Sequence, residues 1–228
     1  TDHGVMYGVI DFYKKAKEIG IKPVIGCEVY VAPRTMQDRV HRIDSSPHHL
    51  VLLCKNMTGY QNLISLVSRG CIDGFYQKPR IDLELLSQKS EGLICLSACL
   101  SGQIPRLLAA GDYAGAKEAA QRYLAIFGTE DYYIEVQNHG IEEQRRILPL
   151  LRRLAGELGV KLAATNDCHY ITKADHRMQH VLTCIQTNTT VDNPSMEFAT
   201  DEFYVKSRDE MAAALPGFEE ALDNTVEI

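Results

Sequence analysis

The chain has 228 residues, of which 45% are hydrophobic and 24% are charged, and its formal net charge is -6. This composition is typical of a globular protein, and no apolar run approaches the roughly 20 residues of a membrane-crossing helix, so we expect no membrane partner. The acidic balance argues against a surface broadly dedicated to nucleic-acid phosphates, although bound divalent ions would reverse the charge of a local site. Seven cysteines without close regular pairing predict reduced thiols in a cytoplasmic protein.

Apolar residues at helical spacing alternate along the chain with short β-rich runs. The expected helices cover residues 6–19, 56–69, 80–88, 104–110, 113–127, 142–158, 175–185 and 209–215. The expected strands cover residues 22–31, 50–54, 92–97, 132–137, 160–165 and 202–206. Pro149 would kink or split the sixth helix. Strands that alternate with helices predict an α/β fold with a parallel sheet, either open or closed into a barrel.

Polar chemistry follows the strand expected at 160–165, where Asp167 and His169 are spaced two residues apart. In an extended backbone such side chains point the same way, with Cα atoms roughly 6.5–7 Å apart. Asp167 and His169 can therefore converge on one metal ion, or on two ions that share a substrate, while Cys168 faces the other side. A polar turn is the common alternative for such a pair.

Other strand-associated positions carry similar groups, as expected for the face of a (β/α) barrel where the carboxyl ends of the strands meet. The further candidates are Asp2, His3, Glu28, His49, Cys99 and His139. A carboxylate such as Glu28 within an apolar strand is costly to bury unless it is paired or metal-bound, although contact with solvent or an arginine would also explain it. His49 begins its strand, so the loop over 33–48 must return across the same face for His49 to join.

Several of these groups have simpler interpretations. His48 competes with His49, because only one of two adjacent strand residues faces inward. The block Asn138-His139-Gly140 can simply be a turn, and the role of Asp2 stays open. Solvent contact or core packing is the simpler interpretation of His41, Cys95, His176 and His180, and of the basic run Arg145, Arg146, Arg152 and Arg153. For the four arginines, DNA contact is the alternative.

The candidates together offer imidazole nitrogen, carboxylate oxygen and thiolate sulfur ligands. Such a mixed set suits zinc, manganese or iron. Two ions ~3.5–4 Å apart form the usual arrangement for hydrolysing phosphoesters. The residues therefore predict a centre for divalent metal ions and phosphoester chemistry.

Several blocks of the sequence, taken in order, resemble the motifs of the PHP (polymerase and histidinol phosphatase) domain family. These blocks are Thr1-Asp2-His3-Gly4, Gly26-Cys27-Glu28-Val29-Tyr30, His49-Leu50-Val51-Leu52-Leu53, Ser97-Ala98-Cys99 and Asn166-Asp167-Cys168-His169-Tyr170. Further blocks resemble the N-terminal region of the alpha subunits of bacterial replicative DNA polymerase III. They are Thr58-Gly59-Tyr60-Gln61-Asn62-Leu63, Lys78-Pro79-Arg80-Ile81-Asp82, Glu91-Gly92-Leu93-Ile94, Gln137-Asn138-His139-Gly140, Phe203-Tyr204-Val205-Lys206 and Asp223-Asn224-Thr225. The resemblance covers essentially the whole chain.

The resemblance implies a distorted (β/α)7 barrel that holds two to three divalent metal ions, with zinc, manganese and iron as the alternatives. It implies ligand roles for His3, Glu28, His49, Cys99, Asp167 and His169. Among these residues, Glu28, Asp167 and His169 are the expected catalytic residues. The resemblance also implies a metal-dependent 3′–5′ exonuclease activity in members that keep the full ligand set, and a structural role in members that have lost it.

The first strand of the family carries a His-x-His motif, and this sequence begins after that motif. We therefore expect a fragment of a longer polypeptide that lacks the first barrel strand and two imidazole ligands, so that the fragment alone binds metal weakly and hydrolyses little. The expected division is a PHP barrel over residues 1–200 and a strand and helix segment over residues 201–228 that leads toward the polymerase domains.

Three functions are compatible with the resemblance. The first is an exonuclease module for DNA replication and proofreading within a DNA-directed DNA polymerase. The second is a non-catalytic docking module that stabilises the polymerase or binds a proofreading subunit. The third is a free-standing phosphatase of histidinol-phosphate type, which the polymerase-like blocks disfavour. The expected partners are DNA, the remaining polymerase domains and other replicase subunits such as a proofreading exonuclease or the sliding clamp.

Overall fold

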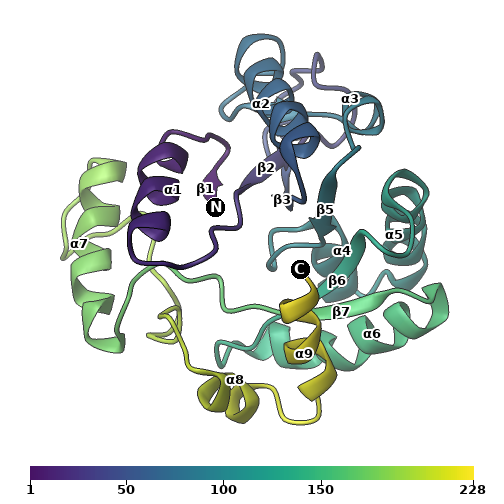
Figure 1. Cartoon of the computed structure of the whole chain (residues 1–228). Helices are drawn as coiled ribbons and strands as arrows, with labels where there is room; N and C mark the ends of the chain where they lie inside the picture. Colours follow the sequence, from purple (N-terminus) through teal and green to yellow (C-terminus); the bar gives the residue numbers. More distant parts are fainter.

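A sheet of seven strands curves through the middle of the molecule in a computed structural model that describes residues 1–228. The strands are β1 (Asp2–His3), β2 (Gly26–Val31), β3 (His48–Cys54), β4 (Arg80–Ile81), β5 (Leu93–Leu96), β6 (Tyr132–Val136) and β7 (Lys161–Ala164). Their order is β1-β2-β3-β5-β6-β7, and β4 pairs with β2. Figure 1 shows these strands arranged around the centre of the molecule, with most helices outside them. The α/β class is confirmed, and the arrangement is consistent with a distorted (β/α)7 barrel.

Helices follow most strands and cover the outside of the sheet. They are α1 (Val9–Glu18), α2 (Met57–Ile72), α3 (Leu83–Gln88), α4 (Gln103–Ala109), α5 (Tyr113–Phe127), α6 (Glu142–Leu158), α7 (His176–Thr187), α8 (Arg208–Ala214) and α9 (Glu219–Glu227). Side-chain oxygens of Asn56, Asp112 and Ser207 accept backbone N–H groups at the starts of α2, α5 and α8, as these residue types do at helix N-termini. Pro149 lies inside α6, which continues through it. None of the helices combines the length and hydropathy that a membrane crossing requires.

Strand β3 runs antiparallel to both of its neighbours, β2 and β5, whereas the other strand pairs are parallel. The expected parallel sheet is therefore mixed at this strand. Parallel neighbours need a crossover, usually a helix, and the link between β2 and β3 contains none. Its turns are held by the buried guanidinium of Arg80, which donates to the backbone carbonyls of Met36, Asp38 and Asp44.

The expected helix over 80–88 is wrong at its start. Arg80 and Ile81 form β4 and pair with the end of β2. The carboxylate of Asp82 then accepts the backbone N–H of Leu85 at 2.9 Å and caps the shorter α3. A local side-chain hydrogen bond thus fixes where the helix begins.

The expected strand over 202–206 is also wrong. In this segment only Tyr204 makes a strand-like bridge, to Tyr170. The side-chain amide of Asn166 donates hydrogen bonds to the carbonyls of Glu202 and Tyr204. These carbonyls are therefore not available for the hydrogen bonds of a regular strand.

Side chains of the strands alternate between two faces of the sheet, as the pleat requires. The outer face packs under the helices in a cluster of 34 buried residues that includes Leu52, Cys95 and Ile134. The inner face carries a small apolar cluster made of Ile94, Leu96, Tyr133 and Ala163. Polar residues that alternate with the outer core are therefore directed to the inner face.

Residues after position 200 pack into the same main core, to which Met211, Leu215 and Phe218 contribute. Helix α9 lies against β7, where the Asn224 side chain donates to the carbonyl of Leu162 at 2.7 Å. Figure 1 accordingly shows the yellow C-terminal helix beside β7, with the chain end near the centre of the curved sheet.

Candidate metal centre

The inner face of the sheet presents Glu28 and His49 beside each other. Glu28 follows the outer-core residue Cys27, and His49 precedes the outer-core residue Leu50, so both point inward. Because β3 runs antiparallel to β2, the first residues of β3 lie beside the last residues of β2, with His49 opposite Tyr30. His49 therefore reaches the site although it stands near the start of its strand.

A carboxylate oxygen of Glu28 lies between two imidazoles. Oε1 of Glu28 is 2.7 Å from Nδ1 of His3 and 2.9 Å from Nδ1 of His49. Sγ of Cys99 lies 3.6 Å from the same His49 nitrogen. Ligand-type atoms of Glu28, His49 and Cys99 all lie within 4.8 Å of one another. This triad of oxygen, nitrogen and sulfur donors is compatible with a metal site.

Asp167 and His169 line the same cavity as His3, Glu28 and Cys99, and this cavity has a volume of about 360 Å³. The rings of His3 and His169 stack with centroids 5.5 Å apart. Oδ1 of Asp167 lies 3.8 Å from Nδ1 of His169. The structure thus brings the expected acid and imidazole after β7 close to the groups from β1, β2 and the corner after β5, while their roles as ligands stay a prediction.

The charges in the cluster depend on burial and on the imidazole contacts. Burial opposes ionisation of Glu28, but hydrogen bonds from His3 and His49 outweigh it and lower the pKa of Glu28 to about 2. The hydrogen bond to Glu28 raises the pKa of His3. Burial raises the pKa of the Cys99 thiol to about 12. An ionised carboxylate is therefore held beside a neutral thiol, and thiolate ligation would release a proton.

Three of the other candidates lie outside this cluster. His48 points to the opposite side of β3 from His49, where its Nδ1 is buried without a hydrogen-bond partner and burial lowers the pKa of His48 to about 4. Asp2 accepts the backbone N–H of Gly8 at 2.9 Å, ahead of α1. Cys95 is part of the outer core. The pleat of β3 thus places His49, and not His48, on the inner face of the sheet.

His139 is fully buried and belongs to the packing beneath the loop that follows β7. Its ring stacks on Phe203 with centroids 3.9 Å apart. Its Nδ1 contacts the side-chain amide of Gln144 at 2.8 Å, and its Nε2 contacts the carbonyl of Asn166 at 3.0 Å. Both ring nitrogens are therefore used in structural hydrogen bonds, away from the triad.

Glu135, on β6, was not among the candidates from the sequence. It is buried, faces inward and lines the same cavity as Asp167. Burial raises the pKa of Glu135 to about 7, against the opposing effect of a hydrogen bond from Thr165. The signal was present in the sequence, because Glu135 interrupts an apolar strand just as Glu28 does.

The segment 198–206 lies over His169. The rings of Phe198 and Phe203 have centroids 4.6 and 5.8 Å from the His169 ring. The backbone N–H of His169 donates to the carbonyl of Phe203 at 2.8 Å. These contacts hold the His169 imidazole against the segment 198–206.

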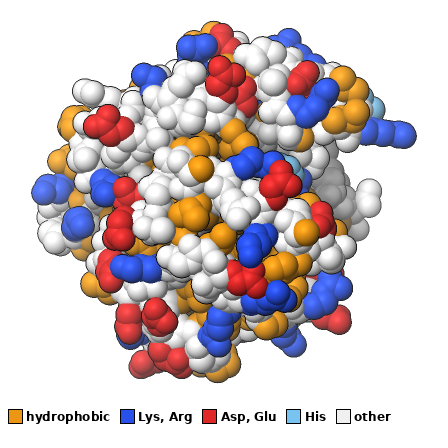
Figure 2. All heavy atoms as spheres, turned by 90° about the vertical axis from the view of Figure 1, so that its right-hand side faces the viewer, with side chains coloured by type: hydrophobic (Ala, Val, Ile, Leu, Met, Phe, Trp, Pro, Cys, Tyr) orange, Lys and Arg blue, Asp and Glu red, His pale blue; other side chains and the backbone are white.

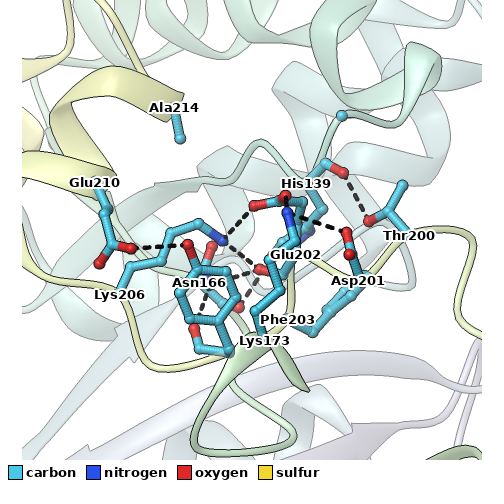
Figure 3. Close-up of polar contacts among 12 residues, drawn as sticks. His139, Asn166, Lys173, Thr200, Asp201, Glu202, Phe203, Lys206, Glu210 and Ala214 are labelled. Atoms are coloured by element: carbon cyan, nitrogen blue, oxygen red, sulfur yellow. Dashed lines mark hydrogen bonds and ion pairs between the residues drawn. The ribbon is translucent and has the colours of Figure 1, made fainter. Parts of the chain in front are cut away.

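Polar contacts tie the segment 198–206 to the rest of the chain. Figure 3 shows Lys206 and Lys173 both reaching Glu202, and Thr200 donating to the carbonyl of His139. The Lys206 ammonium lies 3.0 Å from Oε2 of Glu202 and is almost fully buried. The loop that carries Asp167 and His169 is therefore held by a packed segment.

The basic run on α6 is engaged within the chain. Figure 2 shows basic and acidic side chains interspersed on the face that forms the right-hand side of Figure 1, which includes α5 and α6. Arg145 and Arg146 donate to the carbonyls of Gly140 and Ala109, Arg152 stacks on Phe218 and Arg153 pairs with Glu157. These contacts favour a structural role over DNA contact for the run.

Comparison with known protein families matches residues 1–139 to the PHP domain. The chain belongs to the PHP domain family. Over its whole length the chain is similar to DNA polymerase III subunit alpha of Treponema pallidum, with 49% identity over 230 residues. The proteins of the same name from Thermus aquaticus and Borreliella burgdorferi are 46% and 43% identical over 234 and 233 residues. The chain spans about one fifth of the length of these relatives, since it covers 20%, 19% and 20% of them.

Proposed function

We propose that this PHP domain is part of a DNA polymerase III alpha subunit, a DNA-directed DNA polymerase, and acts as a metal-dependent 3′–5′ exonuclease in replication and proofreading. The observation that carries the proposal is the position of Glu28 between the imidazoles of His3 and His49, beside the Cys99 thiol. The name of the relatives, DNA polymerase III subunit alpha, supplies the substrate class, which is DNA.

Two or three divalent ions of zinc, manganese or iron fit the donors around the cavity. Glu28, His49 and Cys99 would form one ligand group, and His3, Asp167 and His169 would complete the set. When bound, such ions supply an activated water and stabilise the charge that develops on a phosphodiester. Glu28, Asp167 and His169 are the catalytic residues in this proposal.

The chain's own groups prepare the site for this chemistry. A pKa of about 2 keeps Glu28 ionised at neutral pH, as a ligand must be. The cavity of about 360 Å³ between Glu28 and Asp167 lies within the range of sites that take small ligands, about 300–1,000 Å³. It could accept the terminal nucleotide of a strand, and no side-chain nucleophile is needed.

A second function, compatible with the first, is a non-catalytic module that stabilises the polymerase or docks a proofreading subunit. The observation that favours it is that the metal-ligand donors come from separate parts of the fold. These parts are β1, β2, β3, the corner after β5 and the loop after β7. Bound metal would tie these separate parts of the fold together. A third function, a free-standing histidinol-phosphatase-type enzyme, would be tested with small phosphomonoesters as substrates.

The partners in this proposal are DNA, the remaining domains of the same polymerase chain and other replicase subunits, including a proofreading exonuclease and the sliding clamp. The location is the bacterial cytoplasm. The proposed division of the chain is a barrel over residues 1–200 and a following segment over 201–228.

The test is exonuclease activity of the full-length polymerase subunit, purified free of other nucleases, on DNA labelled at its 3′ end. Loss of an outer-shell partner of a metal alone costs about 10- to 100-fold, so Asp167→Ala should lower the rate by at least about 100-fold. Asp192→Ala, which changes an exposed aspartate, should keep the wild-type rate. Equal rates for Asp167→Ala and the wild type would refute the exonuclease and leave the docking function.

A further inference from the structure

We infer that Glu135 is a positioning residue that holds the two backbone corners carrying Cys99 and Asp167 in place at the metal centre. The inference rests on the proposed function, because it assigns a role toward the same metal site. It is carried by a hydrogen-bond network that joins the ends of β5, β6 and β7 through a single buried carboxylate, which is 4% exposed.

The first side of the network fixes the corner that precedes Cys99. The backbone N–H of Ala98 donates to Oε2 of Glu135 at 2.9 Å. The backbone N–H of Glu135 in turn donates to Oγ of Ser97 at 2.8 Å. Ala98 has a φ of +65°, a left-handed conformation that residues with a Cβ rarely adopt unless their surroundings impose it. Glu135 thus supports the disfavoured turn that aims Cys99 into the cavity.

The second side of the network fixes the chain that leads to Asp167. The Thr165 hydroxyl donates to Oε1 of Glu135. The side-chain amide of Gln137 donates at 3.0 Å both to Oε1 of Glu135 and to the Thr165 hydroxyl oxygen. Asp167 itself has a φ of +42°. The backbone at Asp167 is therefore in a disfavoured conformation, as it is at Ala98. The same carboxylate therefore braces both strained corners.

The contacts favour a positioning role over metal ligation for Glu135. Its two oxygens already accept three hydrogen bonds, from Ala98, Gln137 and Thr165. All three partners donate, so the network requires an acceptor at both oxygens. The orientation of the Gln137 amide follows from this arrangement, because exchanging its oxygen and nitrogen would place two acceptors against each other.

Glu135→Gln keeps the shape of the side chain but replaces one carboxylate oxygen with an amide NH₂ group. This new donor would face a group that also donates, such as the backbone N–H of Ala98. Removal of a group that orients a metal ligand typically weakens metal binding by about 10- to 100-fold, and we expect a loss in this range although Glu135 acts through the backbone beside the ligands. The matched control is Asp82→Asn, because Asp82 is also buried and its carboxylate accepts the backbone N–H groups of Met36 and Leu85, away from the cavity.

The experiment is a titration of the metal-free full-length protein with Co²⁺, followed by the sulfur-to-cobalt charge-transfer absorption. This signal reports the thiolate of Cys99 and should be missing in Cys99→Ser. We expect Glu135→Gln to bind Co²⁺ about 10- to 100-fold more weakly than the wild type and to show an altered charge-transfer band. We expect Asp82→Asn to keep the wild-type affinity and band even if its melting temperature falls.

The outcomes separate this inference from the proposed function. A wild-type protein without a Cys99-dependent band would refute the metal centre itself. A normal wild-type band together with an unchanged affinity and band in Glu135→Gln would overturn the positioning role alone, as would equal losses in Glu135→Gln and Asp82→Asn. If Glu135→Gln does not fold, Thr165→Val decides, since it removes one donor from Glu135 and should weaken binding by about 10-fold. Wild-type binding by Thr165→Val would then overturn the inference.

Discussion

Nδ1 of His49 lies 2.9 Å from Oε1 of Glu28, although the two residues stand on strands that run in opposite directions. The contact forms because β3 enters the sheet beside the end of β2, with His49 opposite Tyr30. In a purely parallel sheet the start of β3 would lie at the end of the sheet opposite the other donors. The reversed strand is therefore what allows an imidazole from the beginning of β3 to complete the triad with Cys99.

The two adjacent histidines of β3 should differ sharply in their effect on metal binding. His49→Ala removes a donor from the triad, whereas His48→Ala changes a side chain on the opposite face. We expect His49→Ala to lose bound metal, with affinity at least about 10-fold weaker, and His48→Ala to keep it. Elemental analysis of both purified variants checks this. Equal metal content in the two variants would show that the inner face of β3 is not part of the site.

Removing the divalent ions should lower the thermal stability of the protein. A ligand that binds only the folded state stabilises it by about 2.7 kcal/mol when its free concentration is 100 times Kd. We therefore expect a chelator to lower the melting temperature of the wild type. His49→Ala serves as the control, because its melting temperature should respond much less. A wild-type melting temperature that is the same with and without chelator would contradict a role for metal in stability.

Phe203→Ala should destabilise the fold around His169. Phe203 is 6% exposed and stacks on the buried ring of His139. Truncation of a buried phenylalanine costs about 3–5 kcal/mol, so denaturant unfolding should report a loss of free energy in this range. Val205→Ala is the matched control in the same segment, because Val205 is 59% exposed and such changes stay within about 0.5 kcal/mol. Similar losses for both variants would mean that the segment does not pack as described.

Glu157 should contribute to stability in a pH-dependent way. Hydrogen bonds from Lys117 and Arg153 lower the pKa of Glu157 from 4.5 to about 2. A lowered folded-state pKa stabilises the fold above the ordinary pKa, and this contribution disappears as pH falls through the folded-state value. Glu157→Gln should therefore lower the melting temperature at pH 7, and the difference from the wild type should vanish between about pH 5 and pH 2.

The control for Glu157 is Glu220→Gln, which changes an exposed glutamate on α9. Its melting temperature should follow that of the wild type across the same pH range. If Glu157→Gln weakened DNA binding by the full-length protein without changing stability, the structural role given to Arg153 would be wrong.

Much of the fold could be predicted from the sequence because periodicity reports burial directly. The helix over 113–127 and the helix over 142–158 have the expected bounds, since each has one apolar face. The loop expected over 33–48 is confirmed, and a link without a crossover helix is what allows β3 to run antiparallel to β2. The short β4 could not be separated from α3, because two residues carry no periodicity.

The candidate site could be predicted in part because polar residues inside or just after apolar strands are costly to bury without a partner. That principle found Glu28 and the pair Asp167 and His169, which the structure places at one cavity. The same principle applies to Glu135, which stands inside the buried, otherwise apolar strand β6. His139 was left open from the sequence, because its burial beneath Phe203 depends on a contact 64 residues along the chain.

Anomalous diffraction from crystals of the full-length protein would show whether the cluster around Glu28 holds metal. Data collected at the absorption edges of zinc, manganese and iron would locate and identify the ions. We predict an anomalous peak within ligand distance, about 2.0–2.3 Å, of Glu28, His49 and Cys99, and a further peak beside Asp167 and His169. Crystals grown with these metals that show no peak at either position would refute metal binding by this cluster.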